Sequence, residues 1–160
     1  MLKHFPSTHS DMVNSVEFSR DGKLLVSGGA DKFARVTDRE TGKQLHAFEG
    51  HTSLVLGVSL QANGRTLASV GADGEVKVWN LVSGDRAGKQ SGYKKEITSI
   101  RFIGLTDQAF VTTGEKKARI LRVPMGNPAN VRDLPGAVDV LHTGSVSAGG
   151  GLVVAGGESG

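Results

Sequence analysis

The chain has 160 residues, of which 38% are apolar and 22% are charged, so it is long enough for a single soluble core. It contains no cysteine, which excludes disulfides, thiolate metal sites and a cysteine nucleophile, and no apolar run approaches the roughly 20 residues that span a bilayer. The lack of such a run argues against membrane insertion. The formal net charge is +3, and the basic residues gather between positions 92 and 134. Few aromatic side chains for base stacking lie among them, so we do not expect nucleic-acid binding.

The first predicted elements are four short strands. Apolar residues alternate over 13–18, as in a half-buried strand, and Asp21-Gly22 is a hairpin signal before a second apolar run at 24–29. A third strand is predicted over 33–37, and a fourth, more polar strand over 43–48. Together they predict a four-stranded antiparallel sheet and almost no helix.

The same elements return 42 residues further along the chain. Strands are predicted over 55–60, 66–71, 76–79 and 86–90. Marker residues recur at the same interval, since His9, Ser27, Asp31 and Val36 are followed by His51, Ser69, Asp73 and Val78. A fixed period of this length indicates one supersecondary unit copied along the chain, and four-stranded sheets repeated radially give a β-propeller.

The second copy carries the residues of a known family. Its motif segments are Gly50-His51, Leu67-Ala68-Ser69, Gly71-Ala72-Asp73-Gly74 and Val76-Lys77-Val78-Trp79-Asn80. This pattern strongly resembles a WD repeat, with Trp79-Asn80 in place of the usual Trp-Asp pair. The resemblance implies an all-β propeller of four-stranded antiparallel blades, as one domain over residues 1–160. The repeats are expected at about 2–38, 43–80, 86–123 and 130–160.

The later copies match more loosely. In the third copy the family positions are filled by Tyr93 for histidine, Thr112 for serine, Glu115 or Lys116 for aspartate, and Leu121 for tryptophan. The fourth copy begins near Ala137 and is recognisable at 151–157. About three and a half repeats are fewer than the 4 to 8 blades of a closed propeller. We therefore expect an incomplete ring, completed by more blades of a longer protein or by a second chain, with residues 2–5 as a leading fourth strand.

The resemblance also implies a buried hydrogen-bond relay. In the family the Trp indole donates to Ser, Ser contacts His, and His contacts the turn Asp. The relay residues carried over to this chain are His51, Ser69, Asp73 and Trp79, and in part His9, Ser27 and Asp31. The first copy is partial because Thr37 stands in the tryptophan position and lacks the indole donor.

The same residue types invite a catalytic interpretation. Serine, histidine and aspartate are the members of a nucleophilic triad, but Ser69 lies on a predicted inner strand without a Gly-x-Ser-x-Gly elbow. The set also recurs in the first copy, which a catalytic site rarely needs. The histidine pairs five residues apart lack a partner cluster for a metal, and residues 84–89 are one residue short of a phosphate loop. We therefore predict no enzyme activity, no catalytic or metal-binding residue and no cofactor.

With no catalytic or metal site predicted, we expect function to depend on surface residues, because loops between rigid strands commonly carry recognition residues. The resemblance implies a protein-interaction scaffold that binds proteins or peptides through the end-face loops. The candidate residues in these loops are Asp11, Met12, Lys32, Phe33, Ser53, Leu54, Lys95 and Glu96. For Met12 and Phe33, packing in the core or rim is the preferred expectation over a partner contact.

Two other functions stay open at this point. One is a regulatory or targeting propeller within a larger bacterial multidomain enzyme, and the other is a propeller enzyme in its own right. The absence of a secretory signal in residues 1–10 and of cysteine favours the cytoplasm.

Overall fold

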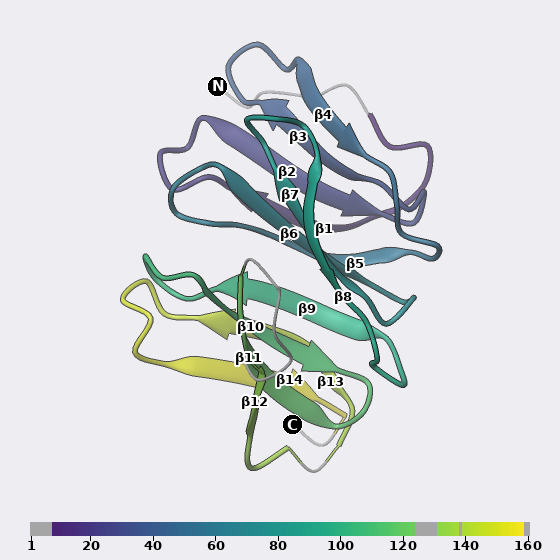
Figure 1. Ribbon diagram of the computed structural model, residues 1–160, viewed down its shortest axis with the longest axis vertical. Helices are drawn as coiled ribbons and strands as arrows, with labels where there is room; N and C mark the ends of the chain where they lie inside the picture. Colours follow the sequence, from purple (N-terminus) through teal and green to yellow (C-terminus); the bar gives the residue numbers. More distant parts are fainter. Residues whose placement is uncertain (1–7, 124–130, 138, 159–160) are drawn as a thin grey trace.

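The chain folds into successive antiparallel sheets. The computed structural model describes residues 8–123, 131–137 and 139–158, and within these ranges it contains strands and no helix (Figure 1). The first sheet holds four strands in chain order, β1 (Val13–Phe18), β2 (Leu24–Gly29), β3 (Ala34–Asp38) and β4 (Gln44–Phe48). The predicted leading strand at residues 2–5 lies outside the described residues.

Two further four-stranded sheets and one pair of strands follow. The second sheet consists of β5 (Val55–Leu60), β6 (Thr66–Gly71), β7 (Val76–Asn80) and β8 (Arg86–Gln90). The third consists of β9 (Ile97–Phe102), β10 (Gln108–Thr113), β11 (Lys117–Arg122) and β12 (Val131–Leu134). The fourth holds β13 (Leu141–Val146) and β14 (Val153–Gly157). The purple first sheet lies near one end of the molecule, and the green and yellow strands of the third and fourth sheets lie near the other (Figure 1).

The sheets are held side by side by their first strands. β1 contacts β5, β5 contacts β9, and β9 contacts β13. Apolar clusters fill the spaces between neighbouring sheets; the one between the first and second sheets includes Val26 and Val36 from one side and Val58 and Leu67 from the other. Strands β5, β6 and β7 are accordingly buried along nearly their whole length on both faces, as expected for stacked propeller blades.

One turn in each complete sheet requires a left-handed backbone. The residue after the acidic turn residue has a φ of 72° at Lys32, 67° at Gly74 and 63° at Lys116. Glycine adopts this conformation without strain, whereas a side chain there costs about 1 kcal/mol or more. The turn between the second and third strands is therefore kept in one shape in all three sheets, even where the sequence does not supply glycine.

Candidate functional site

The second sheet contains a continuous buried network of four side chains. The His51 imidazole, in the loop before β5, lies 2.9 Å from Asp73 Oδ2 through Nδ1 and 2.8 Å from Ser69 Oγ through Nε2. The Trp79 indole Nε1 donates to Ser69 Oγ over 2.9 Å. The relay thereby joins the loop before β5, the β6–β7 turn and the strands β6 and β7.

The chemistry of the four groups fixes the direction of these hydrogen bonds. Indole is only a donor and an ionised carboxylate only an acceptor, so Ser69 accepts from Trp79 and donates to His51, whose Nδ1–H donates to Asp73. That assignment requires a neutral imidazole, and burial lowers the pKa of His51 below its ordinary value. Burial alone raises the pKa of Asp73, but the contacts with His51 and with the Thr52 N–H outweigh it and hold this pKa low.

Residues around the relay make further contacts with Asp73 and Trp79 and hold the adjoining loops in place. Asp73 Oδ2 also accepts the backbone N–H of Thr52 over 3.0 Å and lies 3.4 Å from the ammonium of Lys77, whose side chain is 1% exposed. The indole of Trp79 stacks on Phe48 of the first sheet, with 4.8 Å between ring centroids. A Cβ at Gly71 would lie 2.6 Å from the Leu54 carbonyl oxygen, so this position requires glycine.

The first sheet repeats the network without its tryptophan. His9 lies 2.8 Å from both Asp31 Oδ1 and Ser27 Oγ, through the same two ring nitrogens that His51 uses. Arg35 Nη1 donates to Asp31 over 2.8 Å, in the place that Lys77 takes in the second sheet. Sequence reasoning missed these two buried cations, although a basic residue four positions after the turn aspartate in both copies was a usable signal.

The third sheet replaces the relay with a different arrangement. Tyr93 stands in the histidine position, and the Arg119 guanidinium lies 4.8 Å from the centre of its ring. Glu115 accepts the backbone N–H of Lys94, as Asp73 accepts that of Thr52. These contacts tie the same loops together without a histidine or a buried hydroxyl.

The expectation that Thr112 stands for the serine of the relay is wrong. Ser69 pairs with Val58, and the corresponding residue of the first strand, Ile100, pairs with Val111. A shift of one residue turns a side chain to the opposite face of a strand. Thr112 accordingly lies within 2.8 Å of the Ser99 hydroxyl rather than facing Tyr93.

The geometry of the relay argues against nucleophilic catalysis. Ser69 is 0% exposed, and its oxygen is held between the His51 imidazole and the Trp79 indole. A nucleophile must meet its substrate, and no substrate atom can approach a hydroxyl enclosed in this way. Buried polar groups that satisfy one another in this manner hold strands and loops in a single arrangement.

In the described part of the chain, no group of three or more His, Asp or Glu residues is placed to hold a metal ion. The described residues also include no helix long and apolar enough to cross a membrane.

The predicted partner-facing residues all lie in loops at the end of the sheets where the relay is found. Side chains that are exposed there are those of Asp11, Met12, Lys32, Leu54 and Lys95, and those partly buried are Phe33, Ser53 and Glu96. The packing expectation is wrong for Met12, whose side chain is 67% exposed. Phe33 lies under the Arg35 guanidinium, 4.5 Å from it, and is packed in part.

These loops are anchored by hydrogen bonds of equivalent geometry. The carbonyl oxygen of Met12 accepts the N–H of Ala30 over 2.8 Å, and that of Leu54 accepts the N–H of Ala72 over 2.9 Å. Met12 and Leu54 are 42 residues apart and occupy the same place in successive sheets. A rigid frame therefore presents two exposed apolar side chains in register.

Comparison with known proteins relates the chain to a repeat family and to a curated protein. The WD40 family, described as "WD domain, G-beta repeat", matches residues 2–38 and 42–80. A WD repeat-containing protein 55 homolog from Aedes aegypti is 30% identical over 117 residues, which make up 73% of this chain and 25% of that protein. The chain thus spans about a quarter of the length of this curated relative.

Two solved structures share the fold. The crystal structure of RRP9 WD40 repeats and the structure of U3-55K each superpose with a TM-score of 0.76 at 21% sequence identity. In both cases the alignment covers 84% of this chain and 42% of the solved chain. At this identity the likeness concerns the arrangement of the sheets.

Proposed function

We propose that this chain, which belongs to the WD40 repeat family, is a non-catalytic scaffold that binds partner proteins or peptides through its end-face loops. WD repeat domains in general are protein-interaction scaffolds, and the WD-repeat propeller offers a broad rigid face for this purpose. The observation that carries the proposal is the pair Met12 and Leu54, which are 67% and 39% exposed on loops fixed by backbone hydrogen bonds.

Charged residues surround this apolar pair. Asp11 and Lys32 are exposed beside Met12, and Lys95 is exposed in the matching loop of the third sheet. An apolar centre with a polar rim is the usual anatomy of a protein interface. Rigid loops also lose little conformational entropy on binding, which favours recognition by a preformed surface.

The test is to map where a partner touches the chain in cells. A photo-crosslinking amino acid placed at Met12 or Leu54 is expected to capture the same partner protein. The matched controls are Val82 and Leu105, which are 76% and 73% exposed but lie in turns at the opposite end of the sheets. Equal capture from the control positions, or capture from them alone, would contradict the proposal.

We further propose that additional sheets, from a longer chain or a second chain, cover the first sheet. Val55, Val58 and Leu60 of β5 are at most 6% exposed because they pack on the first sheet, whereas their counterparts on β1 are open. These counterparts are Val13, Val16 and Phe18, exposed by 47%, 57% and 54%. Contiguous exposed apolar side chains on a sheet face mark an interaction or aggregation surface.

Light scattering of the 160-residue chain tests this second proposal. We expect association or aggregation that Val16→Lys reduces, while Leu105→Lys, at a similarly exposed site elsewhere, leaves it unchanged. A stable, folded monomer that does not aggregate would overturn it.

A further inference from the structure

Exposed lysines gather at the end of the sheets where the relay lies. The loops before the first three sheets and the turns between their second and third strands contain, among the described residues, four exposed lysines and two exposed acids. These residues are Lys32, Lys94, Lys95, Lys116, Asp11 and Glu49. Both acids belong to the first two sheets, so the exposed charges of the third sheet in these segments are all positive. Lys32, Lys94 and Lys95 form no ion pair with another described residue.

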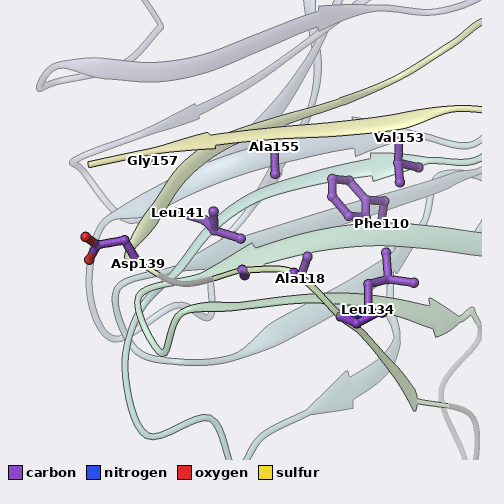
Figure 2. Close-up of a pocket in the computed structure, with 11 residues that line it drawn as sticks. Phe110, Ala118, Leu134, Asp139, Leu141, Val153, Ala155 and Gly157 are labelled. Carbon is purple, nitrogen blue, oxygen red and sulfur yellow. The ribbon is translucent and has the colours of Figure 1, made fainter. Parts of the chain in front are cut away.

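Two of these lysines occupy a strained position of the turn. Lys32 and Lys116 have left-handed φ angles of 72° and 63°. Glycine would take this conformation without strain, so lysine is the less favourable residue for folding here. Lys116 Nζ lies 3.5 Å from the carboxylate of Asp139, which points away from the cavity between the third and fourth sheets (Figure 2). The Lys116 side chain is still 56% exposed, so packing does not explain its presence.

The second sheet lacks the turn lysine for a steric reason. A Cβ at Gly74 would lie 2.9 Å from the Tyr93 carbonyl oxygen and 3.1 Å from that of Lys95. The loop before the third sheet therefore lies against this turn, and its own lysine takes the place of a turn lysine. Each of the three sheets thus has an exposed lysine beside this turn, namely Lys32, Lys95 and Lys116.

The acids of the turns are engaged inside the chain and do not neutralise these lysines. Asp31 accepts a hydrogen bond from Arg35 over 2.8 Å and contacts the first-sheet histidine. Glu115 accepts the backbone N–H of Lys94 and lies 3.4 Å from the Arg119 guanidinium. The exposed ammonium groups are therefore available to a ligand.

We propose that these lysines make the end face an acceptor for an acidic segment of the partner protein. This inference rests on the function proposed above and names the chemistry of the partner. Carboxylates of the segment lie against the lysines, while an apolar residue beside them contacts Met12 or Leu54. Opposite charges across an interface speed association and disfavour wrong partners. The face is formed by loops at the ends of the sheets, so it does not depend on the number of sheets in the ring.

The surroundings of the lysines favour a peptide over a nucleic acid. Proteins that bind single strands combine a basic surface with aromatic rings on which bases stack. The aromatic residue in these segments of the third sheet is Tyr93, which is half-buried and has the Arg119 guanidinium 4.8 Å from its ring centre. Arg119 is itself paired with Asp133 over 2.8 Å, so its planar fork is not free to bind a phosphate. Lysine point charges without stacking rings suit the carboxylates of a peptide.

Binding of a defined peptide tests the charge requirement. Fluorescence anisotropy would compare a labelled peptide in which glutamates flank a pair of leucines with a copy that has glutamine in place of each glutamate. The acidic peptide is expected to bind the 160-residue chain about 10-fold more tightly at physiological ionic strength, and the difference should widen at lower salt. Lys94→Glu combined with Lys95→Glu should weaken binding of the acidic peptide by about 10-fold or more.

A charge-matched variant controls for net charge. Lys23→Glu combined with Lys43→Glu makes the same change in net charge at exposed residues in turns at the opposite end of the sheets. Strands of this length separate the two ends by about 20 Å, which exceeds the screening length of about 8 Å at physiological ionic strength. The control should therefore change binding of the acidic peptide by less than about twofold.

Replacing the strained lysines separates binding from folding. Lys32→Gly combined with Lys116→Gly removes two cations and relieves the left-handed strain. The denaturant midpoint should be unchanged or higher, while the acidic peptide should bind roughly 3- to 10-fold more weakly. Unchanged peptide binding, or a lower midpoint, would contradict the assignment of these lysines to binding.

Other results would overturn the proposal as a whole. These are equal binding of the acidic and glutamine peptides, or full binding of the acidic peptide by the chain with both Lys94→Glu and Lys95→Glu. A single-stranded RNA that binds more tightly than the acidic peptide through the same lysines would assign the face to nucleic acid instead. Crosslinking from Met12 and Leu54 keeps the two proposals apart, because capture there together with these peptide results would reject the acidic partner and leave the interaction face standing.

Discussion

The second and third sheets hold the same loops in place by different chemistry. In the second, His51 and Ser69 form a buried polar relay that ends on Asp73. In the third, Tyr93 lies against Arg119, and valine replaces the serine. The backbone N–H that Asp73 accepts in one sheet is accepted by Glu115 in the other.

A comparison of the second and third sheets shows which parts of the repeat can be replaced. Both sheets keep apolar first strands, since Ile97 and Ile100 are as fully buried as Val55 and Val58. The turn acid is also kept in both. The histidine and the serine form a unit, since both are present in the first and second sheets and both are replaced in the third. A half-satisfied polar network is less favourable than an apolar one, which explains why they are lost together.

Removing the tryptophan should have the largest effect. Trp79→Ala deletes a ring that is 4% exposed, its stacking on Phe48 and the donor to Ser69. We expect the free energy of unfolding to fall by about 3 to 5 kcal/mol, measured by denaturant titration. Leu121→Ala is the matched change in the third sheet and should cost about 2 to 5 kcal/mol. An unchanged denaturant midpoint for Trp79→Ala would contradict the role of the relay in holding the sheets.

Removal of the turn acid should have the next largest effect. Asp73→Ala leaves the Nδ1–H of His51 without its acceptor and should lower the free energy of unfolding by about 1 to 3 kcal/mol. Glu115→Ala in the third sheet removes contacts with no buried histidine behind them, so a loss of about 0.5 to 1.5 kcal/mol is expected. Equal losses in the two sheets would mean that the imidazole contributes nothing to the difference.

The pH dependence of stability should report on the buried histidine of the second sheet, which the third sheet replaces with Tyr93. Burial lowers the pKa of His51 in the folded chain below its ordinary 6.5, so the unfolded chain binds a proton that the folded chain does not. Stability is therefore expected to fall as the pH drops below about 6.5 and to stop falling, for this group, below the folded pKa. Denaturant midpoints across this range should show a smaller slope for His51→Gln, and an identical slope would exclude His51 as the source.

The smallest effect is expected at the arginine of the third sheet. Arg119→Gln removes the cation over the Tyr93 ring and its ion pair with Asp133, both of which are partly open to water. A loss of about 0.5 to 1 kcal/mol is expected in denaturant unfolding. A loss as large as that of Trp79→Ala would mean that the third sheet depends on a polar contact after all.

Much of the fold was predictable because the strand pattern is local. The predicted strands at 24–29, 55–60, 66–71 and 86–90 have the bounds found in the structure. Alternating apolar residues and glycine turns specify such strands directly. The third strand of the first sheet begins at Ala34 rather than Phe33, because Phe33 belongs to the turn and packs under Arg35.

The site was less predictable where register and tertiary contact decide it. The error at Thr112 was a slip of one residue, because the 42-residue period places Val111 after Ser27 and Ser69, and the pairing of Val111 with Ile100 agrees with that period. The contact of Lys77 with Asp73, which lies four residues before it, could by contrast have been predicted from the sequence. The stacking of Trp79 on Phe48 could not be predicted from the period, because it is a contact between neighbouring sheets.

A double-mutant cycle between His51 and Asp73 tests most directly whether the relay is a structural unit. Unfolding free energies of His51→Ala, Asp73→Ala and the double variant give the coupling between the two side chains. We predict a favourable coupling of about 0.5 to 3 kcal/mol, as for residues within one hydrogen-bond network. Simple additivity of the two single losses would contradict the account, because it would mean that the imidazole and the carboxylate stabilise the chain independently.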